Sequence, residues 1–178
     1  CGQGALFEYV RKNAPAVDMR YIGIDVSKVM VRTANVRHGL VRGGQLRKLL
    51  KRYPVLADVK VVRGPKDKTR PKFVVQDFLD PDAGVAADYY VCSGCMTIGD
   101  AKLWDKVSKP FVVKMGRLSR RGMYFNMLSQ RHMKSYPGFA FYDYDEICQW
   151  LATVFPDATI HARHDYLEFR DFSIFVEF

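Results

Sequence analysis

The stretch CGQGALFEYVRKNAPAVDMRYIGID, residues 1–25, decides the fold. Gly2 and Gly4 directly precede a helical pattern of apolar residues, and a short apolar strand then ends at Asp25. Glycines at a strand-to-helix turn let backbone N–H groups approach a polar or anionic ligand, and an acidic residue about 20 positions later can accept hydrogen bonds from ribose hydroxyls. The order of these features predicts the first half of a nucleotide-cofactor site.

A glycine turn of this kind normally follows a strand, but the sequence as given starts at the turn itself, with Cys1 where a Met would begin a chain. We therefore expect the first strand of the sheet to lie upstream of residue 1. That strand would be the central one, so its neighbours would be left with unpaired N–H and C=O groups. We expect residues 1–178 alone to fold poorly or to aggregate.

Apolar periodicity divides the chain into alternating strands and helices. This alternation predicts an α/β fold, a Rossmann-like three-layer sandwich whose sheet is mostly parallel. The last two strands follow each other directly and predict an antiparallel pair at the C-terminal edge. Pro110 should divide or kink the helix that contains it. The expected helices are 5–13, 27–35, 45–53, 102–121 and 145–154, and the expected strands are 21–25, 72–77, 88–92, 123–128, 159–164 and 172–178. The strand 88–92 is expected to be short and buried, and apolar residues alternate with polar or aromatic ones in the last strand.

The composition is that of one globular domain covering residues 1–178, because the chain is 178 residues long and 48% hydrophobic. No apolar stretch approaches the roughly 18 residues that a membrane-spanning helix needs. The four cysteines are too few and too unevenly spaced for the disulfide framework of a small secreted protein. We expect a cytoplasmic protein that does not associate with membranes.

The formal net charge of +9 is concentrated in residues 28–72, which hold fourteen Lys or Arg against two Asp. We expect a basic insertion around residues 36–71. A local basic patch can attract a phosphate-rich partner, which makes RNA binding one hypothesis for this segment. A solvated helix face followed by a loop is the more common origin of such a charge run, and only Tyr53 and Phe73 lie in or beside it for base stacking. Nucleic acid is therefore not the favoured partner.

Two further motifs follow later strands. Asp77-Phe78 lies at the end of the expected strand 72–77, and Ser93-Gly94 follows the expected strand 88–92. These are the third and fourth strands when the expected upstream strand is counted as the first. With the glycine turn and Asp25 in this order, the chain resembles class I S-adenosylmethionine-dependent methyltransferases over essentially its whole length. The closing His164-Asp165-Tyr166, before a final aromatic-rich strand, is similar to a group of bacterial members whose substrates are mostly unassigned.

The resemblance implies S-adenosylmethionine as cofactor and a role for each motif. The glycine turn would lie against the methionine part, and the carboxylate of Asp25 would hold the ribose hydroxyls with Val26 beside the adenine. Asp77 would accept a hydrogen bond from the adenine amino group, and Phe78 would pack on the base. The cofactor-binding residues that the resemblance implies are Cys1, Gly2, Gln3, Gly4, Asp25, Val26, Asp77, Phe78, Ser93 and Gly94, the last two bordering the methyl group.

The expected activity is transfer of a methyl group to a small-molecule acceptor. No catalytic residue can be named, because transfer from a sulfonium needs mainly a positioned acceptor and the exclusion of water. The Asn/Asp-Pro-Pro-Tyr motif of amino-methylating relatives is absent after the fourth strand, so O-methylation is preferred. Tyr124 and Asn126, on one face of the expected strand 123–128, and His164 are the substrate-side candidates. The alternative for Tyr124 and Asn126 is core packing or hydrogen bonding at the sheet edge, and for His164 a structural or exposed position.

Other functions remain open at this point. A nicotinamide site shares the turn and the ribose carboxylate, although Asp77-Phe78 and the antiparallel ending fit methyl transfer better. Cys92 and Cys95 form a CxxC pair of the kind found in redox and zinc sites, but no second pair exists and we expect no metal. A non-catalytic binding module with the same fold is a further hypothesis, against which the presence of Asp25 and Asp77 argues.

Overall fold

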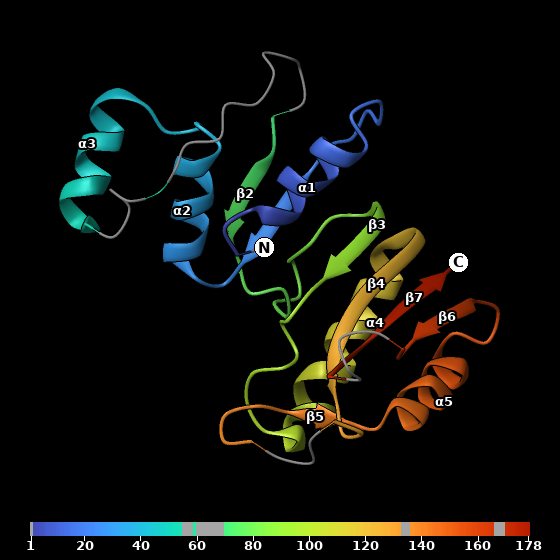
Figure 1. The fold of residues 1–178 in the computed structure, drawn as a ribbon. Coiled ribbons are helices and arrows are strands. Elements are labelled where there is room, and N and C mark those ends of the chain that lie inside the picture. The colour runs from blue at the N-terminus through green and yellow to red at the C-terminus, as the bar shows by residue number, and fades with distance from the viewer. Residues whose placement is uncertain (1, 55–58, 60–69, 133–135, 166–169) are drawn as a thin grey trace. The chain divides into compact units, whose positions relative to one another are not determined.

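The computed structural model describes residues 2–54, 59, 70–132, 136–165 and 170–178 (Figure 1). The chain divides into two compact units, residues 1–83 and residues 84–178. Cys1 and residues 55–58 and 60–69 of the basic segment lie outside the described residues. Among the described residues, no helix has the length and apolar character needed to cross a bilayer.

The first unit contains two parallel strands and three helices. Ser27 begins the second helix as predicted, since its hydroxyl accepts a hydrogen bond from the N–H of Met30 at 3.3 Å. That helix buries Val31 and Ala34 against Phe73 of the second strand, and this cluster is the core beneath the strands. The elements are α1 (Ala5–Asn13), β1 (Ile22–Asp25), α2 (Lys28–Arg37), α3 (Gly43–Arg52) and β2 (Lys72–Val75).

The second unit is built on a sheet whose strands run in the order β3-β4-β7-β6, with the short β5 also pairing with β4. β3 and β5 are parallel to β4, whereas β7 is antiparallel to both β4 and β6. The predicted fold class, with parallel pairs and an antiparallel C-terminal pair, is confirmed. The elements are β3 (Ala87–Cys92), α4 (Lys109–Leu118), β4 (Ser119–Ser129), β5 (Phe141–Tyr142), α5 (Tyr144–Val154), β6 (Thr159–Arg163) and β7 (Asp171–Glu177).

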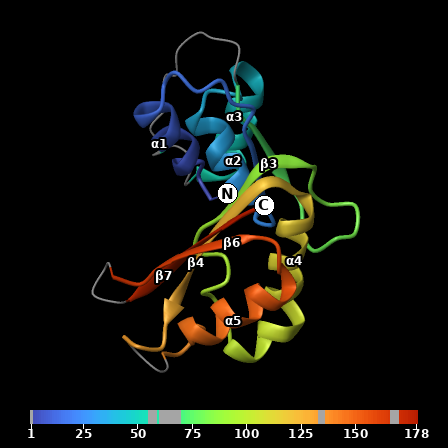
Figure 2. The same cartoon turned by 90° about the vertical axis from the view of Figure 1, so that its right-hand side faces the viewer.

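α4 and α5 cover the same face of this sheet (Figure 2). Every second residue from Met123 to Ser129 of β4 and from Phe172 to Val176 of β7 points into that face and is completely buried, as period-2 alternation requires. The opposite face carries more polar and half-buried side chains. The fully buried residues of the covered face are Met123, Phe125 and Met127 on β4 and Phe172, Ile174 and Val176 on β7.

Two expectations for this unit were wrong. The expected helix 102–121 is a 3₁₀ turn (Ala101–Leu103), a π-helical segment (Trp104–Ser108) and then α4, which ends at Leu118 because Ser119 already pairs with Ala87 in the sheet. Pro110 lies in the first turn of α4, where its missing N–H needs no partner. β3 is not a buried strand, since Tyr89 is 53% and Val91 46% exposed. Among the described residues of this unit, α4 and α5 lie on the other face of the sheet.

Candidate functional site

The C-terminal ends of β1 and β2 bring the predicted ribose and adenine residues to one edge. The strands are parallel with Asp25 beside Val75, and the N–H of Gln76 donates to the carbonyl of Asp25 at 3.0 Å. Asp77 therefore lies one residue beyond the last bond of this ladder. Ligands of α/β folds bind at this edge, outside the carboxyl ends of the strands.

The carboxylate of Asp25 holds the glycine turn. Its Oδ2 accepts a hydrogen bond from the N–H of Gly2 at 2.8 Å, and its Oδ1 accepts one from the N–H of Ser27 at 2.8 Å. Burial raises the pKa of Asp25, but hydrogen bonds from the N–H groups of Ser27 and Gly2, together with nearby positive charge, lower it, and the net result is a pKa below its usual value. Ribose hydroxyls donate hydrogen bonds, and the oxygens of an ionised carboxylate accept them. The site therefore has the charge and the kind of acceptor that ribose hydroxyls bind.

The two glycines of the turn serve different purposes. At Gly4, with φ +79°, a Cβ would come within 2.6 Å of His38 Nε2 and 2.8 Å of Phe73 Cζ. At Gly2, with φ +52°, a Cβ would meet nothing within 4 Å. Gly4 is thus required by packing against the core, whereas Gly2 leaves open space in which a ligand can approach the backbone.

His38 supports this turn and was missed by sequence reasoning. Its ring stacks on Phe73 with centroids 5.3 Å apart and meets the ring of Phe7 edge-on at 5.3 Å. Burial lowers the pKa of His38 although an interaction with the backbone of Gly4 opposes this, so the neutral ring is favoured. The only local signal was a histidine three residues beyond the expected helix 27–35, which does not indicate a partner so distant in sequence.

The remaining first-unit candidates differ in exposure. Val26 is 72% exposed beside Asp25, and Asp77 is exposed with its Oδ1 accepting from the N–H of Leu79 at 2.9 Å. Phe78 is only 7% exposed, so little of its ring is available to a base. Gln3 contacts Arg37, whose Nη1 donates to Gln3 Oε1 at 3.5 Å. The adenine contacts stay a prediction, with Val26 the residue that offers most apolar surface.

In the second unit, Asn126 fixes the turn that follows β3. Its Oδ1 accepts a hydrogen bond from the N–H of Gly94 at 2.9 Å, and its Nδ2 donates to Asp171 Oδ2 at 3.0 Å. On the same face of β4, the hydroxyl of Tyr124 lies 2.7 Å from Ser173 Oγ. Both substrate-side candidates of β4 thus have partners within the sheet. Their contact with an acceptor stays a prediction.

His164 lies in a more enclosed place than a substrate-facing base. It is 7% exposed, its ring stacks on Tyr144 with centroids 5.1 Å apart, and it meets Phe172 edge-on at 5.9 Å. The guanidinium of Arg131 lies 5.4 Å from the centroid of the Tyr144 ring. His164 therefore packs between α5 and β7, and its proposed contact with substrate stays a prediction.

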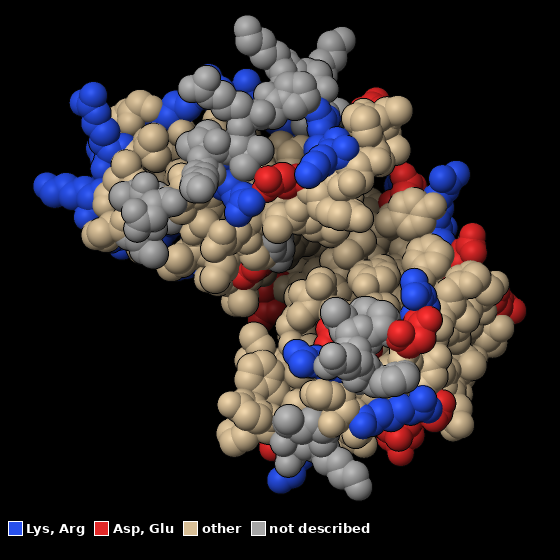
Figure 3. Space-filling view, viewed as in Figure 1, with Lys and Arg blue, Asp and Glu red and all other residues tan. Residues whose placement is uncertain are grey.

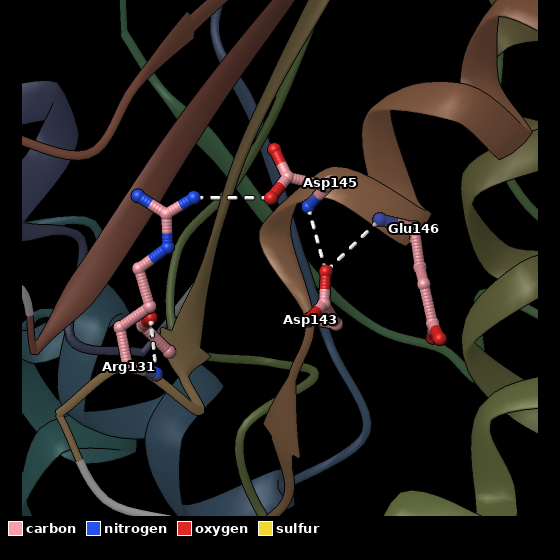
Figure 4. A network of polar contacts seen from close by, with 5 residues as sticks. Arg131, Asp143, Asp145 and Glu146 are labelled. Atoms are coloured by element: carbon pink, nitrogen blue, oxygen red, sulfur yellow. Dashed lines mark hydrogen bonds and ion pairs between the residues drawn. The ribbon is translucent and has the colours of Figure 1, made fainter.

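The start of α5 is organised by carboxylates (Figure 4). Asp143 caps the helix, its Oδ1 accepting from the N–H groups of Asp145 at 2.9 Å and Glu146 at 3.1 Å. Arg131 Nη2 lies 3.0 Å from Asp145 Oδ2. The side chain of Glu146 points away from this ion pair, toward the other side of the helix.

That other side borders a pocket of about 330 Å³ between the start of α5 and the segment that leads into α4. Trp104 and Trp150 form one corner, with ring centroids 5.1 Å apart and planes at 74°. Tyr142 adjoins Trp104 at 5.4 Å. Sequence reasoning missed this pocket, because its walls are far apart in the chain and neither tryptophan stands in a recognisable motif.

The CxxC pair carries no sign of a reactive site. Cys92 is buried, and a hydrogen bond with Cys95, together with burial, raises the pKa of its thiol. A raised pKa keeps the thiol protonated and a poor nucleophile. Across the part of the chain that the structure describes, no group of three or more His, Cys, Asp or Glu residues could hold a metal ion.

Comparison with solved structures finds the same fold at low sequence identity. Magnesium protoporphyrin IX methyltransferase (ChlM) from Synechocystis PCC 6803, with bound SAH, superposes with a TM-score of 0.60 at 16% identity, over 99% of this chain and 70% of its own. An S-adenosylmethionine-dependent methyltransferase from Clostridium acetobutylicum ATCC 824 superposes with a TM-score of 0.60 at 11% identity, over 99% of this chain and 80% of its own. The chain has the fold of class I S-adenosylmethionine-dependent methyltransferases.

Other structures with this methyltransferase fold are larger than the chain. The O-methyltransferase NcsB1 from neocarzinostatin biosynthesis, in complex with S-adenosylmethionine and 2-hydroxy-5-methyl naphthoic acid, has a TM-score of 0.57 at 13% identity, and the match covers 99% of this chain but 46% of NcsB1. No protein-family model and no curated protein sequence matches the chain. The resemblance seen in the sequence is confirmed for the fold.

Proposed function

We propose that the protein is an S-adenosylmethionine-dependent methyltransferase that acts on a small-molecule acceptor, with an oxygen as the preferred acceptor atom. The observation that carries this proposal is the carboxylate of Asp25 at the C-terminal end of β1, 2.8 Å from the N–H of Gly2. In a methyltransferase fold, this is the edge where the cofactor ribose and the glycine turn meet. A module that neither binds a cofactor nor transfers a methyl group would have no need of this arrangement.

The structural neighbours support the cofactor and the acceptor class. ChlM is described with SAM and with SAH, and NcsB1 with SAM and a naphthoic acid. The plantazolicin methyltransferase BamL is described with SAH and a triazolic analogue of desmethylPZN. These acceptors differ widely, so the neighbours favour a small molecule without defining which one.

The chemistry asks little of the protein beyond binding. When bound, S-adenosylmethionine supplies an electrophilic methyl group, so the chain must hold the cofactor, orient an acceptor and exclude water. The ionised carboxylate of Asp25 and the open backbone at Gly2 suit the first of these tasks. Val26 adds apolar surface beside them.

Calorimetric titration of S-adenosylmethionine into the full natural chain tests the proposal. We expect saturable binding. Asp25→Ala should weaken it by at least about tenfold, because the variant loses charge-assisted hydrogen bonds to the cofactor. Asp18→Asn is the matched control. Asp18 is an exposed carboxylate that precedes the N-terminal end of β1, whereas Asp25 is at the C-terminal end. A folded parent protein that binds no cofactor would contradict the proposal.

A second candidate function is methylation of RNA, which one feature of α3 favours. Its leucines Leu46, Leu49 and Leu50 are half-buried, whereas the opposite arc of the helix is exposed and cationic. Lys and Arg side chains gather over this helix in Figure 3. One neighbour of the same fold belongs to the Pnkp1/Rnl/Hen1 RNA repair complex, with a TM-score of 0.58 at 12% identity and 36% of that chain covered. The four exposed cations are Arg47, Lys48, Lys51 and Arg52.

Binding of single-stranded RNA at several salt concentrations separates the two candidates. If the cations of α3 contact phosphates, the logarithm of RNA affinity decreases linearly as the logarithm of salt concentration increases. Each phosphate contact adds about 0.7 to the steepness of this slope. Lys48→Glu with Lys51→Glu should then reduce both affinity and slope, whereas Lys102→Glu in the second unit should change neither. Binding that the α3 variants leave unchanged would remove this candidate.

A further inference from the structure

The pocket between α4 and α5 opens at the edge of the second unit where an acceptor would be expected. β3 and β4 are parallel, so their C-terminal ends lie at the same edge of the sheet. Gln130, directly after β4, lines the pocket, and so does Tyr142 of β5. The hydroxyl of Tyr142 donates to the carbonyl of Met96 at 3.0 Å, which joins the wall of the pocket to the segment following Ser93-Gly94.

The walls are suited to a flat aromatic ring. Trp104, Trp150 and Tyr142 offer three aromatic side chains around one space, and the indoles are half-buried, so part of each faces the pocket. Aromatic rings prefer tilted and offset contacts with one another, which a corner of two indoles at 74° provides. The volume of about 330 Å³ is that of a small-molecule site.

The charge at the pocket favours a cationic ligand. Three carboxylates, Asp105, Asp143 and Glu146, line it with one cation, Lys109. Lys109 Nζ lies 2.6 Å from Asp105 Oδ1, so these two charges compensate each other. Asp143 caps α5 through its Oδ1. Glu146 has no ion-pair partner among the described residues and is the carboxylate best placed for a ligand.

We propose that this pocket holds the acceptor and that the acceptor is an arylalkylamine with a phenolic hydroxyl group, its ring against Trp104 and Trp150 and its ammonium facing Glu146. This inference rests on the proposed methyltransferase function and adds the substrate class. The ammonium anchors the molecule, and the hydroxyl at the other end of the ring is the group left for methylation. Transfer would form the O–CH₃ bond, break the S–CH₃ bond of S-adenosylmethionine to leave SAH, and release the hydroxyl proton to solvent. The ammonium of Lys109 already lies 5.7 Å from the Trp104 ring centroid and 5.8 Å from that of Trp150, so Glu146, and not the indole faces, anchors the ammonium of the ligand.

The chain provides its own reporter, because Trp104 and Trp150 are its two tryptophans and both line the pocket. Three matched probes are titrated against intrinsic tryptophan fluorescence of the full natural chain. They share a phenol ring and differ at the other end: tyramine is cationic, 4-ethylphenol is neutral and 3-(4-hydroxyphenyl)propionate is anionic. We expect tyramine to bind about five- to tenfold more tightly than 4-ethylphenol, and the anion most weakly.

Two variants assign the preference to Glu146. Glu146→Gln keeps size and removes the charge, and should bring tyramine to the affinity of 4-ethylphenol. Asp145→Asn removes a charge one residue away whose side chain points to Arg131, and should leave the preference intact. Equal affinities for the three probes, or equal effects of the two variants, would overturn the proposal.

Calorimetry with SAH on the same samples separates this inference from the proposed function. SAH binding without an amine preference leaves the methyltransferase proposal standing and overturns the substrate class. An amine preference in a folded protein that binds no SAH overturns the acceptor role of the pocket together with the proposed function. SAH binding with a preference lost only in Glu146→Gln supports both.

Discussion

The side-chain amide of Asn126 bridges two strands and a turn: it accepts a hydrogen bond from the N–H of Gly94 at 2.9 Å and donates one to Asp171 at 3.0 Å. Asn126→Leu removes both bonds and leaves two half-buried polar groups without them. We expect a loss of about 1–3 kcal/mol in the free energy of unfolding, measured by urea denaturation. Asn13→Ala, which removes an exposed bond to the carbonyl of Tyr9, should change stability by less than about 0.5 kcal/mol. Equal effects would show that the bridge adds no stability.

The two glycines of the turn should respond differently to alanine. Gly4→Ala places a Cβ 2.6 Å from His38 Nε2 in addition to an unfavourable φ, and we expect it to destabilise the fold by about 2 kcal/mol or more. Gly2→Ala meets open space and should cost about 1 kcal/mol from its backbone conformation alone. Thermal unfolding and cofactor titration measure the two effects. Gly2→Ala should stay folded but bind cofactor more weakly, and the reverse ranking in stability would contradict the packing described for Gly4.

His38 should make stability depend on pH. Burial lowers its pKa in the folded protein, so below about pH 6.5 the unfolded chain binds a proton that the native protein does not. The stability that neutral His38 contributes is therefore complete above about pH 6.5. It is lost as pH falls from there toward the lowered pKa of the folded protein. His38→Phe, which can keep the ring contacts, should flatten this slope in urea denaturation between pH 7.5 and about pH 5. The same substitution at the exposed His132 is the control and should leave the pH dependence of stability unchanged. An unchanged pH dependence in His38→Phe would exclude His38 as its source.

At the start of α5, a cap should matter more than an ion pair. Asp143→Ala removes the acceptor for two backbone N–H groups and should cost about 1 kcal/mol. Arg131→Ala breaks a pair whose side chains are 55% and 63% exposed, and should cost at most about 0.5 kcal/mol. Urea denaturation of both variants decides the order, and a larger loss for Arg131→Ala would contradict it.

Local features of the fold were predictable from the sequence. The hydroxyl of Ser27 caps α2 because capping depends on residues three positions apart, and the alternation in β4 and β7 gave their buried faces. Pro110 marked a change of helix geometry correctly. The end of α4 was not predictable, because Ser119 leaves the helix to pair with Ala87, a contact between distant residues.

The candidate site shows the same division. Asp25 and the glycine turn could be identified from spacing, because strand, turn and helix follow one another in the chain. The contact of Asn126 with Gly94 and the corner of Trp104 and Trp150 depend on how separate strands and helices pack. The sequence around Asn126, Trp104 or Trp150 does not indicate which residue each of them contacts.

The contact between Asp25 and the ribose is the central claim, and a double-mutant cycle tests it most directly. Calorimetry compares SAH with its analogue lacking the ribose hydroxyls, in the parent protein and in Asp25→Asn. We predict that removing the hydroxyls costs the parent about 1–3 kcal/mol of binding free energy and costs Asp25→Asn almost nothing. An equal loss in both proteins would mean that Asp25 does not hold the ribose, and would contradict the account.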